Sequence, residues 1–370
     1  MKPLICFYKN QFYLYSTDYT FLSCPEDTTV DAFLQSIEKE YFQELKVIQV
    51  NYEYDHQLYN KNPKPGLYCG AKAHVFIVHQ FDQLTIDQID LWLKKYNNST
   101  QYNSAVFTSP AFKPLIEKQE FLHQVDLIKK DIALGRLYQA NLTAPLIADC
   151  SDSAEVLFEK YLPNFKGQYK ALLPCHDFSI LSYSPELFLE KNGNTLITRP
   201  IKGSISSEKS FTQDLYTNQK EAAELSMIVD LLRNDLNSLS LDHSAEVTAH
   251  REPMNLGYIQ HTYSEIKVQS EKSLPYTLQR TLPGGSISGC PKLESLKVIH
   301  EIEKYQRQFY TGTIGWWQEN NFQLSLTIRS FLKFGPTLVY HAGCGIVHES
   351  SPESEWQEFL IKTGGLCDLD

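Results

Sequence analysis

The sequence predicts an α+β protein built on antiparallel β-sheets. Short apolar runs follow one another through tight turns, and only a few long segments have helical spacing. Strands joined by hairpins pair antiparallel, whereas strictly alternating strands and helices would indicate a parallel sheet. At 370 residues the chain is long enough for more than one domain. We predict an N-terminal α/β region over residues 1–118 and a larger domain over residues 119–370.

In the N-terminal region the apolar residues follow the alternation of strands in some segments and the spacing of helices in others. Its predicted elements are a hairpin over residues 5–16, a helix over 30–45, a strand over 74–79 and a helix over 85–96. Polar segments at residues 60–66 and 97–104 interrupt this pattern, and the second is the better candidate for a linker.

The larger region opens with a helix and then becomes rich in strands. Residues 121, 125, 128 and 132 are apolar at helical spacing, and Gly135 stands where a helix commonly ends. The later predictions are strands over 137–146, 169–174, 178–183 and 186–190, an Asn192-Gly193 hairpin turn, a helix over 218–236, a glycine-rich loop over 283–289, a helix from Pro291 to 303, strands over 309–317, 322–332 and 337–347, and a helix from Ser351 to 364.

Composition narrows the class of protein. The net charge of −10 argues against a nucleic-acid-binding domain, which should be basic. No apolar run approaches the roughly 20 residues that a membrane span needs. The eight cysteines are scattered without a Cys-x-x-Cys pair, which is typical of free thiols in a reducing compartment. We therefore expect a soluble cytoplasmic enzyme.

Two pairs of glutamates on predicted helices are candidate metal ligands. Glu221 and Glu224 are three residues apart, as are Glu355 and Glu358, so each pair shares a helix face. Four converging carboxylates would need a cation, and oxygen ligands suit Mg²⁺. The alternative is that each pair is simply a solvated helix face, where the same spacing is common.

A glycine-rich segment and several isolated ionisable residues are further candidates. Residues 283–292 form a loop that runs into a helix, which could bind an anion or be an ordinary turn. Four ionisable residues lie in apolar strand-like segments: Glu186, Lys202, His261 and Arg329. An arginine in such a place pairs with a carboxylate of the protein or of a ligand, and a desolvated lysine gains nucleophilicity.

Six segments, taken in order, resemble the chorismate-utilising enzymes. They are Leu137–Thr143, Ser184–Phe188, Arg199–Ser204, Glu224–Asp235, Pro283–Lys292 and Ala342–Glu358. The family includes anthranilate synthase component I, aminodeoxychorismate synthase component I, isochorismate synthases and salicylate synthases. The resemblance covers residues 119–364, and it implies two stacked antiparallel sheets with helices outside and the active site between them.

The resemblance also implies roles for particular residues. Glu224 and Glu358 match direct Mg²⁺ ligands, and Glu221 and Glu355 match the residues that hold the waters of the ion. Tyr310 and Arg329 match residues that bind the enolpyruvyl carboxylate of chorismate. The remaining matches are Ser286, Gly343 and Gly345, which would line the substrate, and His261, which would lie beside the leaving C4 hydroxyl.

Two positions favour one reaction within the family. Members that add water carry a lysine where this chain has Gln139. Glutamine cannot act as a base, so we expect Gln139 to contact the substrate without activating water. Members that aminate chorismate at C4 resemble this chain in carrying a lysine at the position of Lys202, where anthranilate synthases usually carry alanine. Lys202 would attack C2 while an acid matching Glu186 protonates the leaving hydroxyl.

We therefore expect aminodeoxychorismate synthase component I, which uses chorismate and ammonia in folate (4-aminobenzoate) synthesis. Cys344 lies in Gly-Cys-Gly and not in the Gly-x-Cys-x-Gly sequence of glutamine amidotransferases. Use of glutamine would then require a separate amidotransferase subunit as partner. The alternatives are anthranilate synthase component I and, from another class, a chorismate-binding protein without turnover.

Overall fold

The computed structural model of the protein describes residues 2–9, 12–54, 64–67, 71–99, 110–206, 219–255 and 259–363. Its helices are α1 (Val30–Glu40), α3 (Ile86–Ser99), α4 (Lys118–Ala133), α5 (Ala154–Tyr161), α7 (Gln219–Asn237), α8 (Leu274–Thr281), α9 (Gly285–Ser288), α10 (Lys292–Ile302) and α11 (Pro352–Lys362). No helix in these ranges is both long and apolar enough to span a membrane.

The strands form an antiparallel arrangement throughout the described ranges. They are β1 (Leu4–Phe7), β2 (Tyr13–Ser23), β3 (Leu45–Val50), β4 (Ala73–Leu84), β5 (Lys113–Pro114), β6 (Gln139–Asp149), β7 (Tyr169–Pro174), β8 (Ser179–Ser184), β9 (Leu187–Asn192), β10 (Thr195–Arg199), β11 (Ile201–Ser206), β12 (Glu246–Asn255), β13 (Ile259–Gln269), β14 (Gly289–Cys290), β15 (Thr313–Gln318), β16 (Asn321–Leu326), β17 (Ser330–Phe334) and β18 (Thr337–Ile346). Every pairing between them is antiparallel, as the sequence predicts.

Most of the described strands pair with one another in one continuous series. Its first half is β6–β18–β17–β8–β7–β1–β2, and its second half is β4–β3–β15–β16–β9–β10–β13. The N-terminal strands are therefore hydrogen-bonded to later ones, β1 to β7 and β3 to β15. The predicted division at residue 118 remains a prediction.

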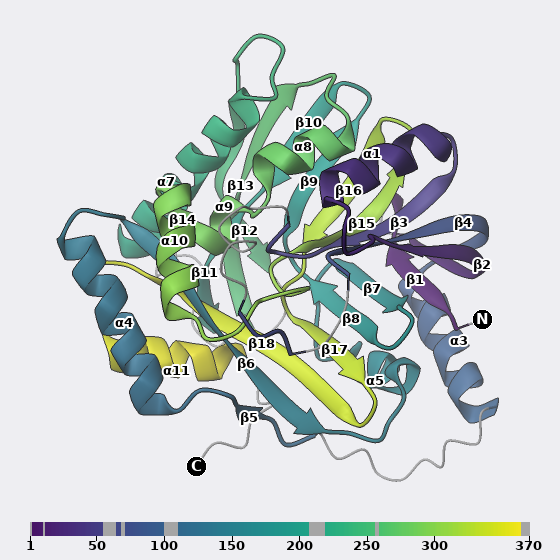
Figure 1. Ribbon diagram of the computed structural model, residues 1–370, viewed down its shortest axis with the longest axis horizontal. Coiled ribbons are helices and arrows are strands. Elements are labelled where there is room, and N and C mark those ends of the chain that lie inside the picture. Colours follow the sequence, from purple (N-terminus) through teal and green to yellow (C-terminus); the bar gives the residue numbers. More distant parts are fainter. Residues whose placement is uncertain are drawn as a thin grey trace.

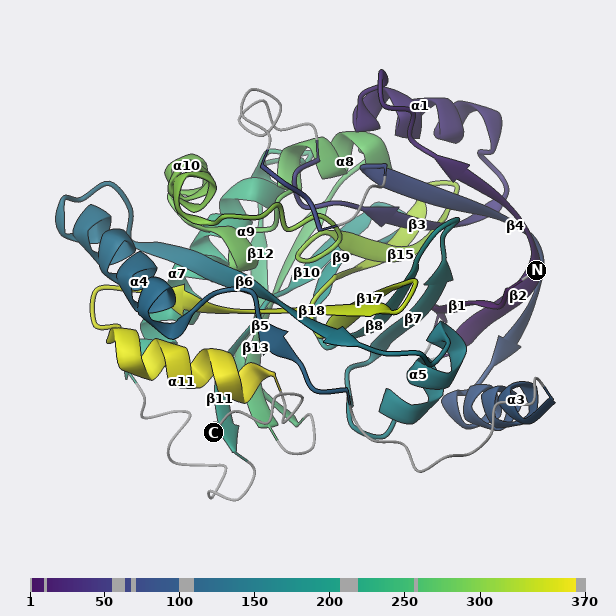
Figure 2. The same cartoon turned by 60° about the horizontal axis from the view of Figure 1, so that its bottom comes forward.

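Two hydrophobic cores hold these strands and their helices together. One core combines side chains of β6, β8, β17 and β18 with Ile314 and Trp316 of β15, so distant parts of the series share one core. The other packs α1, α7 and α8 against strands that include β9, β15 and β16. Figures 1 and 2 show α1, α3, α4 and α11 at the periphery, with α4 and α11 side by side on one flank, whereas the short α9 lies further inside. The fold is thus α+β, with helices outside antiparallel sheets.

Most local predictions are confirmed, but several differ. The helix predicted over residues 30–45 ends at Glu40, and Leu45 already begins β3. Gly135 follows α4 with a positive φ of 72°, and Gly193 turns from β9 to β10 with φ 57°. The glycine-rich loop contains one helical turn, α9, instead of being wholly irregular. The strand expected over residues 322–332 is divided into β16 and β17, because Arg329 between them has a left-handed φ of 49°. The polar segment 97–104 lies mostly outside the described residues.

Candidate active site

A cavity of about 510 Å³ lies among strands and helices from both halves of the sheet series. β6, β11, β13 and β18 supply lining residues, and so do α7, α9 and α11. The cavity is large enough for a small organic substrate. Its walls are partly polar, because charged side chains from several of these elements converge on it.

Most of the residues singled out in the sequence meet in this cavity. Those that line it are Glu186, Lys202, Glu224, His261, Ser286, Tyr310, Arg329, Gly343, Gly345 and Glu358. Gln139 and Glu355 are buried beside the cavity without lining it. Glu221 lies on α7, but its side chain falls outside the described part of the structure. The site residues are thus gathered by the fold, while the chemical role of each remains a prediction.

A buried carboxyl and an amine meet at the α9 turn. The Ser286 hydroxyl donates to Glu186 Oε1 at 2.7 Å, and Lys202 Nζ donates to the Ser286 carbonyl at 3.4 Å. Glu186 is 4% exposed, and this burial raises its pKa to about 7, although Ser286 and Lys202 act in the opposite direction. A carboxyl with that pKa can donate a proton near neutral pH, as a general acid must.

Local backbone geometry explains the glycine after α9. Gly289 has φ 145°, and a Cβ atom there would lie 2.1 Å from the Gln139 carbonyl oxygen. Only glycine allows this approach, which lets β14 pair with β6. The close packing fixes α9, and with it Ser286, against the cavity.

Arg329 and His261 form a second polar group in the cavity. Arg329 Nη2 donates to His261 Nε2 at 3.0 Å, while Arg329 Nη1 is buried and has no hydrogen-bond partner among the described residues. The sequence predicted Arg329 within a strand, but it occupies the left-handed turn between β16 and β17. That turn directs a guanidinium with unused hydrogen-bonding capacity to the cavity, where it can bind a carboxylate.

Tyr310 is backed by a histidine that the sequence analysis did not identify. The rings of Tyr310 and His341 stack with centroids 4.8 Å apart. Burial raises the pKa of Tyr310 to about 12 and lowers that of His341 to about 3, so both rings are neutral at physiological pH. His341 lines the cavity with Gly343 and Gly345. Because alternate residues of a strand share one face, their spacing along β18 could have identified His341 as a cavity residue from the sequence.

The carboxylates from α7 and α11 approach β18. A Cβ atom at residue 345 would lie 3.8 Å from Glu224 Oε2, and Cys344, Glu355 and Glu358 have potential ligand atoms within 4.8 Å of one another. Burial raises the pKa of the Cys344 thiol well above its ordinary value, and Sγ donates to the Glu355 backbone carbonyl. The oxygens of Glu355 and Glu358, with Glu224 Oε2 near Gly345, suit a hard cation such as Mg²⁺, whereas the sulfur of Cys344 is a soft ligand that already donates to a backbone carbonyl.

Lys362 is a second residue that the sequence analysis missed. Its Nζ lies 2.7 Å from Glu358 Oε1 and donates to the Gly343 carbonyl at 2.9 Å. Burial by itself would lower the pKa of Lys362, but Glu358 raises it above its ordinary value. The four-residue spacing from Glu358 to Lys362 on α11 was a signal that both side chains share one helix face.

Gln139 supports β18 from behind the cavity. It is 1% exposed, and a Cβ atom at residue 345 would lie 2.6 Å from its Nε2 atom. Gln139 Oε1 has no hydrogen-bond partner within the described ranges. The predicted contact between Gln139 and substrate stays a prediction.

Comparison with known proteins identifies the family but not a single activity. Aminodeoxychorismate synthase component 1 from Bacillus subtilis (strain 168) is 31% identical over 281 residues, 74% of this chain and 60% of that protein. Anthranilate synthase component 1 from Lactococcus lactis subsp. lactis (strain IL1403) is 30% identical over 290 residues, 76% of this chain and 62% of that protein. These matches span about three fifths of the length of the curated relatives.

Solved structures show the same fold at lower identity. Anthranilate synthase component I from Streptococcus pneumoniae TIGR4 superposes with a TM-score of 0.77 at 21% identity, covering 99% of this chain and 90% of that one. The menaquinone-specific isochorismate synthase from Escherichia coli gives 0.73 at 16% identity, covering 99% and 88%. The sequence profile of the chorismate binding enzymes matches residues 20–368, and the chain therefore belongs to that family.

Proposed function

We propose that the protein is aminodeoxychorismate synthase component I, which replaces the C4 hydroxyl of chorismate by an amino group derived from ammonia. The observation that carries this proposal is the proximity of an amine and a buried acid in one cavity. Lys202 and Glu186 both contact Ser286, and Glu186 has a pKa of about 7. A direct attack of ammonia at C2 has no need of the lysine.

The proposed reaction has two substitution steps. In the first, Lys202 Nζ forms a bond to C2 of chorismate as the C4–O bond breaks, and a proton from Glu186 lets the hydroxyl leave as water. In the second, ammonia forms a bond to C4 and the C2–N bond to Lys202 breaks, while one proton of the added nitrogen returns to the Glu186 carboxylate, so that both the amine and the acid are regenerated. A covalent intermediate divides one difficult substitution into two easier ones. The balance is chorismate plus ammonia giving aminodeoxychorismate plus water.

Other residues of the cavity would bind and orient the substrate. Arg329 Nη1 is available for a carboxylate of chorismate, and Tyr310 lines the same cavity as a neutral hydroxyl donor. Glu224 and Glu358 would hold Mg²⁺ directly, with Glu355 and Glu221 around it. Bound there, Mg²⁺ would offset the negative charge of a substrate carboxylate.

Ammonia would come from a separate glutamine amidotransferase subunit. Cys344 is fully buried, and its raised pKa keeps the thiol protonated, so it is unsuited to attack glutamine. The purified chain should therefore use ammonium salts but not glutamine. Turnover with glutamine by the chain alone would contradict this part of the proposal.

The deciding experiment identifies the product formed from chorismate, Mg²⁺ and ammonium. A product that an added lyase converts to 4-aminobenzoate supports the proposal. Direct formation of fluorescent anthranilate would overturn it in favour of anthranilate synthesis, the activity in the name of the Lactococcus relative. Chorismate binding without consumption would indicate the non-catalytic alternative.

A further inference from the structure

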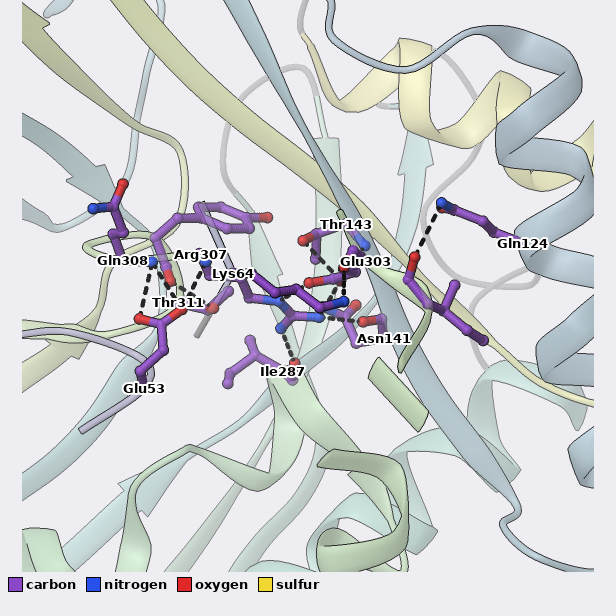
Figure 3. Close-up of polar contacts among 12 residues, drawn as sticks. Glu53, Lys64, Gln124, Asn141, Thr143, Ile287, Glu303, Arg307, Gln308 and Thr311 are labelled. Carbon is purple, nitrogen blue, oxygen red and sulfur yellow. Dashed lines mark hydrogen bonds and ion pairs between the residues drawn. The ribbon is translucent and has the colours of Figure 1, made fainter. Parts of the chain in front are cut away.

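A buried arginine lies directly behind the α9 side of the cavity. Arg307, in the segment between α10 and β15, is 2% exposed. Its Nη1 donates to the Ile287 carbonyl at 2.8 Å, and its Nη2 donates to the Asn141 carbonyl at 2.5 Å. Figure 3 shows the guanidinium between these two carbonyls and the Glu303 carboxylate. One side chain therefore joins two separate walls of the cavity, α9 and β6.

The α9 wall is where the proposed chemistry takes place. Ile287 follows Ser286, whose hydroxyl donates to Glu186 and whose carbonyl accepts from Lys202. A displacement of the Ile287 carbonyl would therefore also move the adjoining residue, Ser286, which contacts both the acid and the amine. Arg307 does not line this cavity, so its influence on the reaction passes through these backbone groups.

Arg307 is itself fixed by two buried carboxylates. Glu303 accepts from Arg307 Nε at 2.9 Å and from Nη2 at 2.6 Å, and it also accepts from the backbone and hydroxyl of Thr143. Glu53 accepts from the backbone nitrogens of Arg307 and Gln308. Glu53 follows β3, so the N-terminal region contributes to the position of this arginine.

We propose that Arg307 is a positioning residue of the chorismate site, which holds the Ile287 and Asn141 carbonyls so that Ser286 faces Glu186 and Lys202. This inference rests on the proposed function, because it concerns the geometry of that acid and amine. The planar guanidinium donates in several fixed directions at once, whereas the ammonium of lysine is a single point of charge. Lysine at this position would keep the charge and lose the bridge between the two walls.

The test is steady-state consumption of chorismate by Arg307→Lys, with Mg²⁺ and ammonium, whichever product forms. We expect kcat to fall at least tenfold, since a displacement of about 1 Å at a reacting group can cost about 100-fold. The KM for chorismate should change less than about threefold, because Arg307 does not contact the cavity. Loss of the Ser286 hydrogen bond, which lowers the pKa of Glu186, should move the alkaline limb of kcat/KM to higher pH.

The pH profile separates positioning from a purely structural role. The titratable groups that face the cavity with Glu186 are Lys202, Glu224, His261, Tyr310, Arg329, His341, Glu358 and Lys362. None of them is substituted in Arg307→Lys, so the comparison with wild type isolates a change in geometry. An activity lowered by one factor at every pH, with an unmoved alkaline limb, would overturn the inference.

Two further variants keep the test decisive. Lys46→Met is the control. It removes another buried cation, which lies away from the cavity and donates to the backbone carbonyls of Tyr41, Phe42 and Glu44, and it should leave the pH profile unchanged.

Glu53→Gln weakens the support of Arg307 more gently, and it decides the matter if Arg307→Lys does not fold. We expect Glu53→Gln to lower kcat with a nearly constant KM, and wild-type kinetics would overturn the inference. A wild-type protein that consumes no chorismate would refute the proposed function and this inference together.

Discussion

Replacing Glu186 by glutamine removes a carboxyl that is costly to ionise in the folded protein. Glu186 is 4% exposed, and burial raises its pKa from an ordinary 4.5 to about 7, against the opposing effects of Ser286 and Lys202. At about 1.4 kcal/mol per pH unit, this difference in pKa means that ionising Glu186 costs roughly 3 kcal/mol more in the folded protein than in the unfolded chain. Glutamine fills nearly the same space and can still accept the Ser286 hydroxyl proton, but it never ionises.

The direction of the effect follows from proton binding. The folded protein holds the Glu186 proton more tightly than the unfolded chain does, so the stability it contributes is fully present below pH 4.5. That stability is lost as the pH rises through about 7. Relative to Glu186→Gln, we expect the free energy of unfolding of the wild type to fall by roughly 3 kcal/mol between pH 4.5 and about 8. The variant should also lose about 100-fold or more in turnover, because it has no general acid.

The measurement is urea unfolding of both proteins, followed by tryptophan fluorescence, at several pH values across this interval. Glu26→Gln, which changes an exposed carboxyl before α1, controls for the removal of one negative charge. The Glu26→Gln curve should run parallel to that of the wild type. If the Glu186→Gln curve also runs parallel to the wild type, Glu186 is not held protonated by burial and the assignment of the acid fails.

Three other predictions concern the metal ligands and the amine. Glu224→Ala or Glu358→Ala should lower Mg²⁺-dependent turnover more than about 100-fold and weaken Mg²⁺ binding in calorimetry without unfolding the protein, and near-normal turnover would refute the metal site. Lys362→Met removes the cation 2.7 Å from Glu358 Oε1 and should tighten Mg²⁺ binding by about 1 kcal/mol, roughly fivefold, whereas weaker binding would show that Lys362 supports the site. Lys202→Arg should be inactive and form no covalent adduct with chorismate in mass spectrometry, because guanidinium cannot attack, and an active variant would exclude the covalent route.

The sequence by itself determined the elements that depend on neighbouring residues. Helical spacing and the glycine after it specify α4 and its end just before Gly135, and Asn192-Gly193 specifies the turn from β9 to β10. The order of the six family segments also pointed to the cavity residues, including Lys202. These features can be predicted because turn residues, apolar spacing and the order of segments are all recorded directly in the sequence.

Only the tertiary structure decided which of these residues act on one another. Arg329 stands in an apolar, alternating sequence that predicts an unbroken strand. In the structure its backbone has a left-handed φ that interrupts the strand, and its side chain donates to His261. Glu53 reaches the backbone of Arg307 across 254 positions, and no local pattern records that contact. The pKa of Glu186 likewise depends on burial among elements that are distant in sequence. Burial and electrostatic interaction are set by distances in space, so they arise only when the packed fold brings these side chains together.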